Sequence, residues 1–409
     1  MLTKNRTFRL AMAGLLSLSL ATVAAPVVAQ DDMADWDAIL AEAEGQTVNW
    51  HMWSGSEPIN AYVDGYVADR AAELGVTLNR VPGDAPIIVQ KVLGEKEAGK
   101  DDGGSVDLVW INGENFKTAK QADLLVCAWA ESLPNRQYVP ETGAINNDFG
   151  TPVEGCESPW SSAQFAFVYD SAKVPEPPST MAELLEWIEA NPGMFTYPAL
   201  GTTDFTGSVF VRSVLYHANG GFEDLLGEFD QAKFDEASAK TWEILNGIEP
   251  FLWRGGGTYP QDKAELDNLY SNGEIAMTMT YGPGEVGGLV ADGIYPDTTR
   301  EFVFDHGTIG NNNYVAIPYN AANQAGAMVV ADILLSPEAQ LLKKDPVEGF
   351  GADPVIDFGL TDLADEFAAI PVPESVLPIA ELMKNSNPEL QSGYITATEA
   401  GWVENVLQR

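Results

Sequence analysis

T-V-N-W-H-M-W-S-G-S-E-P, at residues 47–58, indicates the class of fold. Its first seven residues are typical of a buried strand, and the small residues and proline that follow suit a turn into a helix. Farther along, the sequence predicts a strand over 77–81, a helix over about 85–98 and a third strand over 106–111. Strands that alternate with helices in this way predict a parallel α/β sheet with right-handed crossovers.

A second α/β series follows in the chain. Residues 194–197 and 274–280 are expected to be strands, and 204–218 and 232–245 are expected to be mostly helical. About 380 of the 409 residues follow the export signal described next, which is more than one hydrophobic core usually serves. The sequence therefore predicts two lobes.

The N-terminus has the order of features found in a secretory signal. Three basic residues precede an apolar run at 10–25, and small residues lead to an expected cleavage point after Ala29. The apolar run is interrupted by hydroxyl residues and is shorter than the roughly 20 residues that a spanning helix needs. We expect residues 1–29 to be a cleaved signal peptide and the mature protein to be periplasmic. Gln30, rather than a cysteine, follows the cut, so a lipid anchor is not expected.

The formal net charge of −38 at pH 7 bounds the possible partners. Nucleic acid is excluded as a partner, because its binding requires a basic surface. The acidity fits either attraction of cationic ligands or solubility in a saline habitat. Cys127 and Cys156 are the two cysteines, and an oxidising compartment permits them to form a disulfide, which we predict.

Two segments resemble nucleotide-binding motifs, but each lacks a feature that the motif requires. The segment 94–101 approaches a phosphate-binding loop, but it follows a predicted helix and has Asp101 where a hydroxyl residue is needed. The glycine-rich segment 282–287 follows a strand, yet no acidic strand end comes about 20 residues later. The three histidines are scattered. We therefore expect no cofactor and no metal ion.

Catalytic constellations are sparse. An acidic pair made of Asp204 and Glu285 leaves open the alternative of a secreted hydrolase. Another alternative is a surface interaction module that has no small ligand. The sequence favours a protein that is not an enzyme.

Aromatic residues stand at or beside several predicted strand ends: Trp53, Trp110, Trp160, Phe205 and Tyr281. Large aromatics often fill cores, so each of them is either a core residue or a ligand contact. Acidic residues such as Glu114, Asp204 and Glu285 occur nearby in the sequence. Aromatic faces next to acids suit a cationic or zwitterionic organic solute.

Five stretches together resemble the family 1 extracellular solute-binding proteins of bacterial ABC transporters, and within them a YnjB-like branch near the thiamine-, polyamine- and iron-binding receptors. The stretches are V-N-W-H-M-W-S-G at 48–55, F-A-F-V-Y-D-S-A-K-V-P at 165–175, N-G-E-I-A-M-T-M-T-Y-G-P-G-E at 272–285, G-T-I-G-N-N-N-Y-V-A-I-P at 307–318 and A-D-I-L-L-S-P-E-A-Q at 331–340. The resemblance covers almost the whole mature chain. It departs from the paired-tyrosine site of iron-binding members, because Gly282 follows Tyr281.

The resemblance implies a two-lobed periplasmic-binding-protein fold of type II, in which each lobe is a mixed sheet flanked by helices. Lobe 1 is expected to comprise 30–162 and 313–345, and lobe 2 to comprise 163–312 and 346–409, with hinges near 159–164 and 310–314. Ser54 and Asn112 stand at predicted strand ends, where α/β sheets bind ligands, and the resemblance adds Asn312 to the residues expected to line the cleft between the lobes.

The implied activity is binding without chemistry. A monomeric receptor captures a small organic solute, thiamine- or polyamine-like, closes around it, and docks on an inner-membrane permease that is powered by an ATPase. The complete set of expected ligand contacts is Trp53, Ser54, Trp110, Asn112, Glu114, Trp160, Asp204, Phe205, Tyr281, Glu285 and Asn312.

Overall fold

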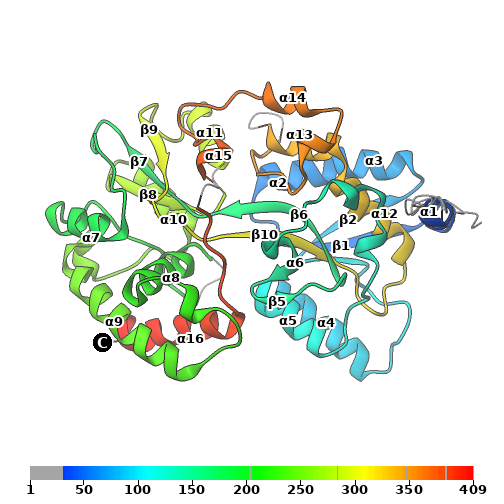
Figure 1. Ribbon diagram of the computed structural model, residues 1–409, viewed down its shortest axis with the longest axis horizontal. Coiled ribbons are helices and arrows are strands. Elements are labelled where there is room, and N and C mark those ends of the chain that lie inside the picture. Colours follow the sequence, from blue (N-terminus) through cyan, green and yellow to red (C-terminus); the bar gives the residue numbers. More distant parts are fainter. Residues whose placement is uncertain (1–30, 202–204, 283, 346–348, 383–384, 409) are drawn as a thin grey trace, which may run out of the picture.

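The protein is described by a computed structural model that covers residues 31–201, 205–282, 284–345, 349–382 and 385–408. Two lobes lie side by side, and the strands β6 (Glu157–Gln164) and β10 (Gly310–Ala316) run across the space between them (Figure 1). The predicted signal peptide, residues 1–29, lies outside the described residues.

Lobe 1 is built on a five-stranded sheet in the order β2-β1-β3-β10-β6. The strands β1 (Thr47–Met52), β2 (Thr77–Pro82) and β3 (Leu108–Ile111) are parallel, as their alternation with helices predicted. β10 pairs antiparallel with both β3 and β6, which makes the sheet mixed. The remaining elements of lobe 1 are α1 (Asp31–Ala43), α2 (Glu57–Tyr62), α3 (Ala68–Glu73), α4 (Ala85–Glu97), α5 (Gly113–Gln121), α6 (Gly143–Asn146), β4 (Asn147–Asp148), β5 (Thr151–Pro152), α12 (Gln324–Leu335), α13 (Pro337–Lys344) and α14 (Ala364–Ala368).

Lobe 2 contains a three-stranded antiparallel sheet in the order β8-β7-β9. Its strands are β7 (Ala166–Asp170), β8 (Met277–Thr280) and β9 (Thr299–Phe302). Its helices are α7 (Met181–Ala190), α8 (Thr206–Asn219), α9 (Gln231–Ile248), α10 (Lys263–Ser271), α11 (Gly284–Ala291), α15 (Ile379–Leu382) and α16 (Ser392–Trp402). Thr180 caps α7 by accepting a hydrogen bond from the backbone N–H of Glu183.

The chain crosses between the lobes three times in the described residues. It passes from β6 into β7, returns from β9 into β10, and crosses again between Phe367, which packs on lobe 1, and Val376, which packs on lobe 2. Beyond the third crossing, Asn387 exchanges backbone hydrogen bonds with Thr308 and Gly310 beside the start of β10. The connection between the lobes therefore consists of three segments.

Each lobe has a large apolar core of its own, and lobe 1 has a smaller apolar cluster as well. The core of lobe 1 is centred on Trp50, Trp160 and α12, and the core of lobe 2 is centred on Phe167, Phe210 and Trp402. Residues 350–358 pack in the core of lobe 1, beyond the predicted boundary at residue 345. We therefore propose that lobe 1 extends to about the third crossing and that lobe 2 takes the residues after it.

Other local predictions met different outcomes. The Cys127–Cys156 disulfide is confirmed. The strand predicted at 194–197 is wrong: its backbone makes single hydrogen bonds to Trp253 and Ala276 instead of a ladder, and its buried aromatic side chains produced the strand-like pattern. In the described part of the chain no single helix is long and apolar enough to span a membrane, and α12 with α13, bent by 57°, passes that test only as a pair.

Candidate functional site

Several helices begin where the two lobes face each other. α5 begins directly after β3, α11 begins soon after β8, and α8 begins at Thr206. The ring of Phe149 in lobe 1 meets that of Phe205 in lobe 2, with centroids 5.8 Å apart. Since ligands of α/β sheets bind beyond the carboxyl ends of strands, this interlobe region is the candidate site.

Four tryptophans form a chain of edge-to-face contacts in lobe 1. Ring centroids are 5.8 Å apart for Trp50 and Trp160, 5.0 Å for Trp160 and Trp110, and 6.1 Å for Trp110 and Trp53. Trp160 is 1% exposed, whereas Trp53 is 43% exposed. The row of four rings runs from the core to the surface. Trp53 and the half-buried Trp110 therefore keep ring surface outside the core, and Trp160 does not.

A polar network joins the end of β3 to the hinge strand β10. The indole N–H of Trp110 donates to Oδ1 of Asn112 at 3.0 Å, and Nδ2 of Asn112 donates to the backbone oxygen of Asn312 at 2.6 Å. Oδ1 of Asn312 accepts from the hydroxyl of Ser162 at 2.8 Å. Ser54 is also engaged, because its hydroxyl accepts from Nη1 of Arg80 at 2.8 Å. These hydrogen bonds hold the ends of β1 and β3 against the neighbouring strands β2, β10 and β6.

Lobe 2 contributes a buried ion pair. Arg212 of α8, which is 0% exposed, donates from Nη2 to Oε1 of Glu389 at 2.8 Å and from Nε to Oε2 at 3.1 Å. Tyr281 donates its hydroxyl to the same Glu389 at 2.7 Å, and the guanidinium lies 4.5 Å from the ring centre of Phe205. The predicted residues Phe205 and Tyr281 therefore meet around a buried arginine.

Further acids surround this pair. Ser208 links Arg212 to Glu399, since it accepts from Nη1 of Arg212 at 2.6 Å and donates to Glu399 at 2.9 Å. Glu114, on α5 of lobe 1, lies within electrostatic range of Arg212, Glu389 and Glu399. Burial raises the pKa of the Glu114 carboxyl, and the two acids of lobe 2 raise it further while Arg212 lowers it. Carboxylates of both lobes thus converge around one arginine.

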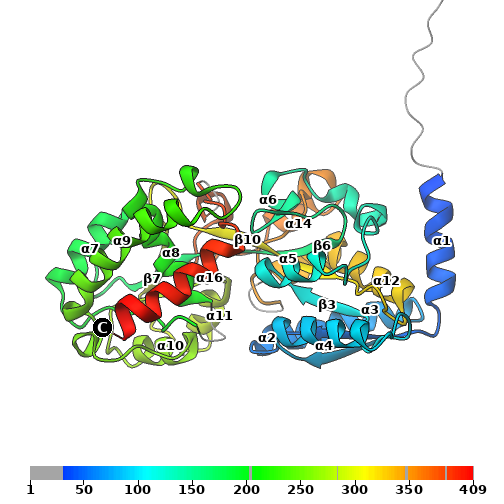
Figure 2. The ribbon, with the colours of Figure 1, turned by 90° about the horizontal axis from the view of Figure 1, so that it is seen from below.

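A groove of about 480 Å³ opens between α5 and α16, which pack against each other across the lobes (Figure 2). Its volume is in the range of about 300–1,000 Å³ that small-molecule sites commonly have. Glu114 is the one predicted ligand contact in its lining, which comprises Glu114, Lys117, Thr118, Gln121, Phe229, Gln231, Ser392, Gly393, Thr396, Ala397 and Ala400.

Two glycines bring the backbones of the lobes into contact. A Cβ atom built on Gly284, the first residue of α11, would lie 2.1 Å from the carbonyl oxygen of Gly351 in lobe 1. A Cβ on Gly351 would lie 2.7 Å from Cα of Gly284. The lobes can approach this closely only because both residues lack a side chain.

We expect Gly284→Ala to hold the lobes farther apart. The added methyl group has no room beside Gly351, so the ligand-free protein should show a larger radius of gyration by small-angle X-ray scattering. Gly247→Ala in α9 is the matched control, because a Cβ there meets nothing within 4 Å. A Gly284→Ala protein as compact as the control would show that this contact does not limit closure.

The described residues include only one of the two acids considered for hydrolysis. Glu285 lies 3.6 Å from Nζ of Lys263 in an ion pair, and Asp204 lies outside the described residues. Among the described residues, no group of three or more His, Cys, Asp or Glu side chains is placed to hold a metal ion. The arrangement therefore does not favour the hydrolase alternative.

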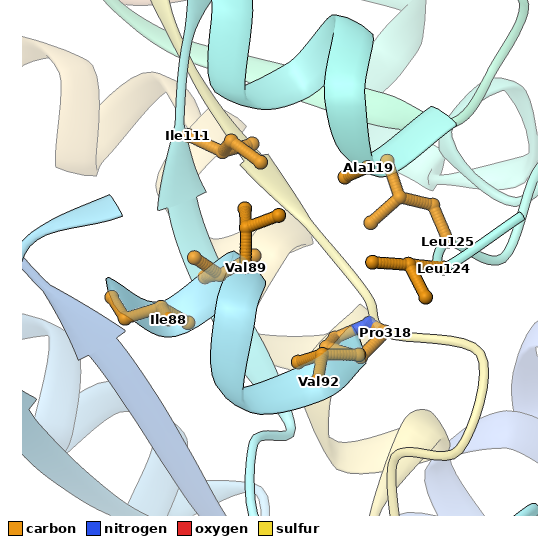
Figure 3. A pocket seen from close by; sticks show the side chains of 9 residues that line it. Ile88, Val89, Val92, Ile111, Ala119, Leu124, Leu125 and Pro318 are labelled. Atoms are coloured by element: carbon orange, nitrogen blue, oxygen red, sulfur yellow. The ribbon is translucent and has the colours of Figure 1, made fainter. Parts of the chain in front are cut away.

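A small cavity lies away from the cleft, between α4, α5 and β3 (Figure 3). Side chains including Ile88, Val92, Ile111 and Leu124 point into it, and its volume is about 10 Å³. That volume is close to what one water molecule needs, and the lining is apolar. This cavity is a packing feature of lobe 1 and does not fit a solute.

Sequence reasoning missed Arg212, Glu389 and Glu399. Arg212 was detectable in principle, because it is the one charged residue in the apolar run V-F-V-R-S-V-L at 209–215, and a charge on the buried side of a helix needs a partner. Glu389 and Glu399 have no such signal. They are two acids among 60, and only the fold of the C-terminal segment brings them to the cleft.

Comparison with known proteins agrees with this architecture. Residues 61–343 match the family described as bacterial extracellular solute-binding proteins. Over 393 residues the chain is 38% identical to protein YnjB of Escherichia coli (strain K12), a match covering 95% of this chain and 96% of that protein.

Solved structures share the fold. An ABC transporter structure from Clostridium perfringens ATCC 13124 has a TM-score of 0.61 at 18% identity and covers 88% of this chain and 98% of its own. A putative spermidine/putrescine ABC transporter from Listeria monocytogenes also has a TM-score of 0.61, at 14% identity, and covers 89% and 99%. Apo ferric ion-binding protein A of Pasteurella haemolytica has a TM-score of 0.59 at 14% identity and covers 89% and 98%.

Two lobes joined by crossing strands, an interlobe groove and these matches lead to one conclusion: the chain belongs to the bacterial extracellular solute-binding proteins and has their type II fold.

Proposed function

We propose that the protein captures a small organic cation between its lobes and delivers it to the permease of an ABC importer. The observation that carries this proposal is the convergence of acids from both lobes around a single, already paired arginine. The description of the matching family gives solute binding as the role of its members.

The charges at the interlobe contact favour a positive ligand. The guanidinium of Arg212 is paired with Glu389, so its single positive charge offsets only part of the charge that Glu114 and Glu399 add. When the lobes close, acids of opposite lobes approach one another in a region shielded from water, and this raises the free energy of the ligand-free closed state. A cation held between the acids removes that cost and favours closure.

Aromatic surface adds a second preference. One face of Phe205 is occupied by Arg212, whereas Trp53 keeps a large part of its ring exposed at the end of β1. A cation over an exposed aromatic face gains about 0.5–1 kcal/mol, and more when water is excluded. An organic cation with apolar carbon atoms therefore suits the cleft better than a hydrated metal ion.

Closure then follows as a shift of populations. A solute that binds the closed arrangement more tightly than the open one draws the lobes together by that difference in affinity. The closed form presents surfaces of both lobes to the permease, whose ATPase drives import. In this proposal the protein acts as a soluble periplasmic monomer after cleavage of residues 1–29.

The proposal is tested with a panel of solutes. At least one organic cation from a set containing putrescine, spermidine and thiamine is expected to raise the melting temperature and reduce the radius of gyration. Glucose and citrate serve as neutral and anionic comparisons. No response to any cation, or a response to glucose or citrate instead, would contradict the proposal.

We expect Glu114→Gln to weaken binding of the responding cation by at least about tenfold, because the amide cannot offset the ligand's charge in a partly desolvated site. Isothermal titration calorimetry measures the change. Glu97→Gln, on the exposed surface of α4, is the matched control and should bind like the unmodified protein. Equal affinities for the two variants would remove Glu114 from the site.

A further inference from the structure

A short hairpin of lobe 1 reaches the opposite lobe. It consists of β4 and β5, and its turn residues Phe149 and Gly150 make the contact. The ring of Phe149 meets Phe205, and a Cβ atom built on Gly150 would lie 3.5 Å from Cα of Gln391 in the segment before α16. The residue just before this turn, Asp148, is therefore positioned at the meeting of the lobes.

Asp148 is buried and has one unused carboxyl oxygen. Its side chain is 1% exposed, and Oδ2 accepts a hydrogen bond of 2.6 Å from the backbone N–H of Gly113 at the start of α5. Oδ1 has no hydrogen-bond partner among the described residues, and the same holds for both carboxyl oxygens of the neighbouring Glu157. An unpartnered buried carboxylate is costly, so a structure that keeps one gives it a proton or a ligand.

The groups around Asp148 are almost all acidic. Burial raises the pKa of Asp148, and Glu114 on α5 and Glu389 across the lobe boundary raise it further, while the N–H of Gly113 lowers it. Burial and Asp148 likewise raise the pKa of Glu157 in β6. Tyr314 of β10 also faces the pair, with its hydroxyl donating to backbone oxygens of α6.

Asp148 and Glu157 differ in what they face. The charges that act on Glu157 come from Asp148 and Lys120, both in lobe 1, whereas those that act on Asp148 include Glu389 of lobe 2. Asp148 is thus the member of the pair whose pKa depends on a charge in the opposite lobe. Glu157 is the first residue of β6.

We propose that Oδ1 of Asp148 is the deepest contact of the bound solute and accepts a hydrogen bond from its ammonium group. The inference rests on the proposed function and names a ligand contact that the sequence did not suggest. In the ligand-free protein Asp148 carries a proton. When the ammonium group arrives, that proton passes to solvent, and the carboxylate pairs with the cation.

A dependence on pH follows from this exchange. Binding of an already protonated amine releases one proton, so affinity should rise about tenfold per pH unit while Asp148 is protonated in the free protein, and level off above its pKa. Lowering the pH should therefore promote release of the solute.

The test counts protons by isothermal titration calorimetry at a series of pH values, in the range where affinity rises with pH, each in two buffers that differ in ionisation enthalpy and carry no ammonium group. Putrescine and spermidine, whose ammonium groups can donate to Oδ1, are the probes. The unmodified protein should release close to one proton for each probe molecule bound. Asp148→Asn should release none and bind at least about tenfold more weakly, because the amide carries no titrating proton and no charge.

Two further variants serve as controls. Asp37→Asn, an exposed position on α1 at the outer end of lobe 1, should leave affinity and proton release unchanged (Figure 2). Glu157→Gln keeps Asp148 and should still release a proton, which separates ligand contact from a general effect on packing. Circular dichroism confirms that each variant is folded.

Each result has a distinct meaning. If a probe binds with the same affinity and proton release in Asp148→Asn as in the unmodified protein, the assignment of Asp148 is overturned while the proposed function stands. If no probe produces heat or compaction in any variant, the proposed cationic ligand is wrong, and the role of Asp148 falls with it.

Discussion

Arg212→Met is expected to lower the free energy of unfolding by about 3–5 kcal/mol, the range found when one member of a buried ion pair is removed. Glu389 would remain in a site where its side chain is only 2% exposed, without the guanidinium that balances it. Tyr281 would be the remaining hydrogen-bond donor to its Oε1. Urea unfolding followed by circular dichroism measures the loss.

The double variant Arg212→Met, Glu389→Gln should recover much of this stability, because it leaves no uncompensated charge. Arg70→Met is the matched surface control: its pair with Glu73 is half exposed, so the change should stay within about 1 kcal/mol. Equal losses at positions 70 and 212 would mean that the buried pair has no special role.

Removal of the disulfide is the second large effect. The double variant Cys127→Ala, Cys156→Ala should lose about 3–4 kcal/mol, since the bond closes a loop with a sequence separation of 29 and restricts the unfolded chain. Cys156 directly precedes β6, so the bond also anchors the start of a hinge strand. Thermal unfolding with and without a reductant measures the loss.

Reduced unmodified protein is expected to match the double variant, which tests the bond itself rather than the alanine side chains. Hydrogen exchange should locate the loss of protection in lobe 1, because both cysteines lie there, and leave the core around Phe210 unchanged. A stability change below about 1 kcal/mol would contradict the chain-entropy argument for this loop.

Much of the fold was predictable because its signals are local. The strand at 47–52, the helix at 85–97 and the helix at 324–335 each combine an apolar pattern with a clear beginning. The segment 194–197 has the same apolar character without a pairing partner, and whether a buried segment gains a ladder depends on distant parts of the chain. The last boundary between the lobes depends on distant contacts in the same way: it was expected at residue 345, whereas residues 350–358 pack in the core of lobe 1.

The candidate site was predictable only in part. Trp53, Asn112 and Tyr281 follow strands, and the rule for α/β sheets locates such residues without further information. The ion pair of Arg212 and Glu389 joins positions 177 residues apart, and Asp148 depends on a two-stranded hairpin too short to leave a pattern. Trp160 was expected at a strand end, but it lies within β6 and its ring is buried in the core of lobe 1.

The three crossings also set the order in which the cores can be completed. A chain made from its N-terminus alternates between lobes: lobe 1 lacks β10 and α12 until residues near 335 emerge, and lobe 2 lacks Trp402, which is 0% exposed in its core, for longer still. A chain that ends before residue 335 therefore lacks part of both cores. Such a partial chain exposes apolar surface that the later segments would cover, and exposed apolar surface of this kind promotes aggregation.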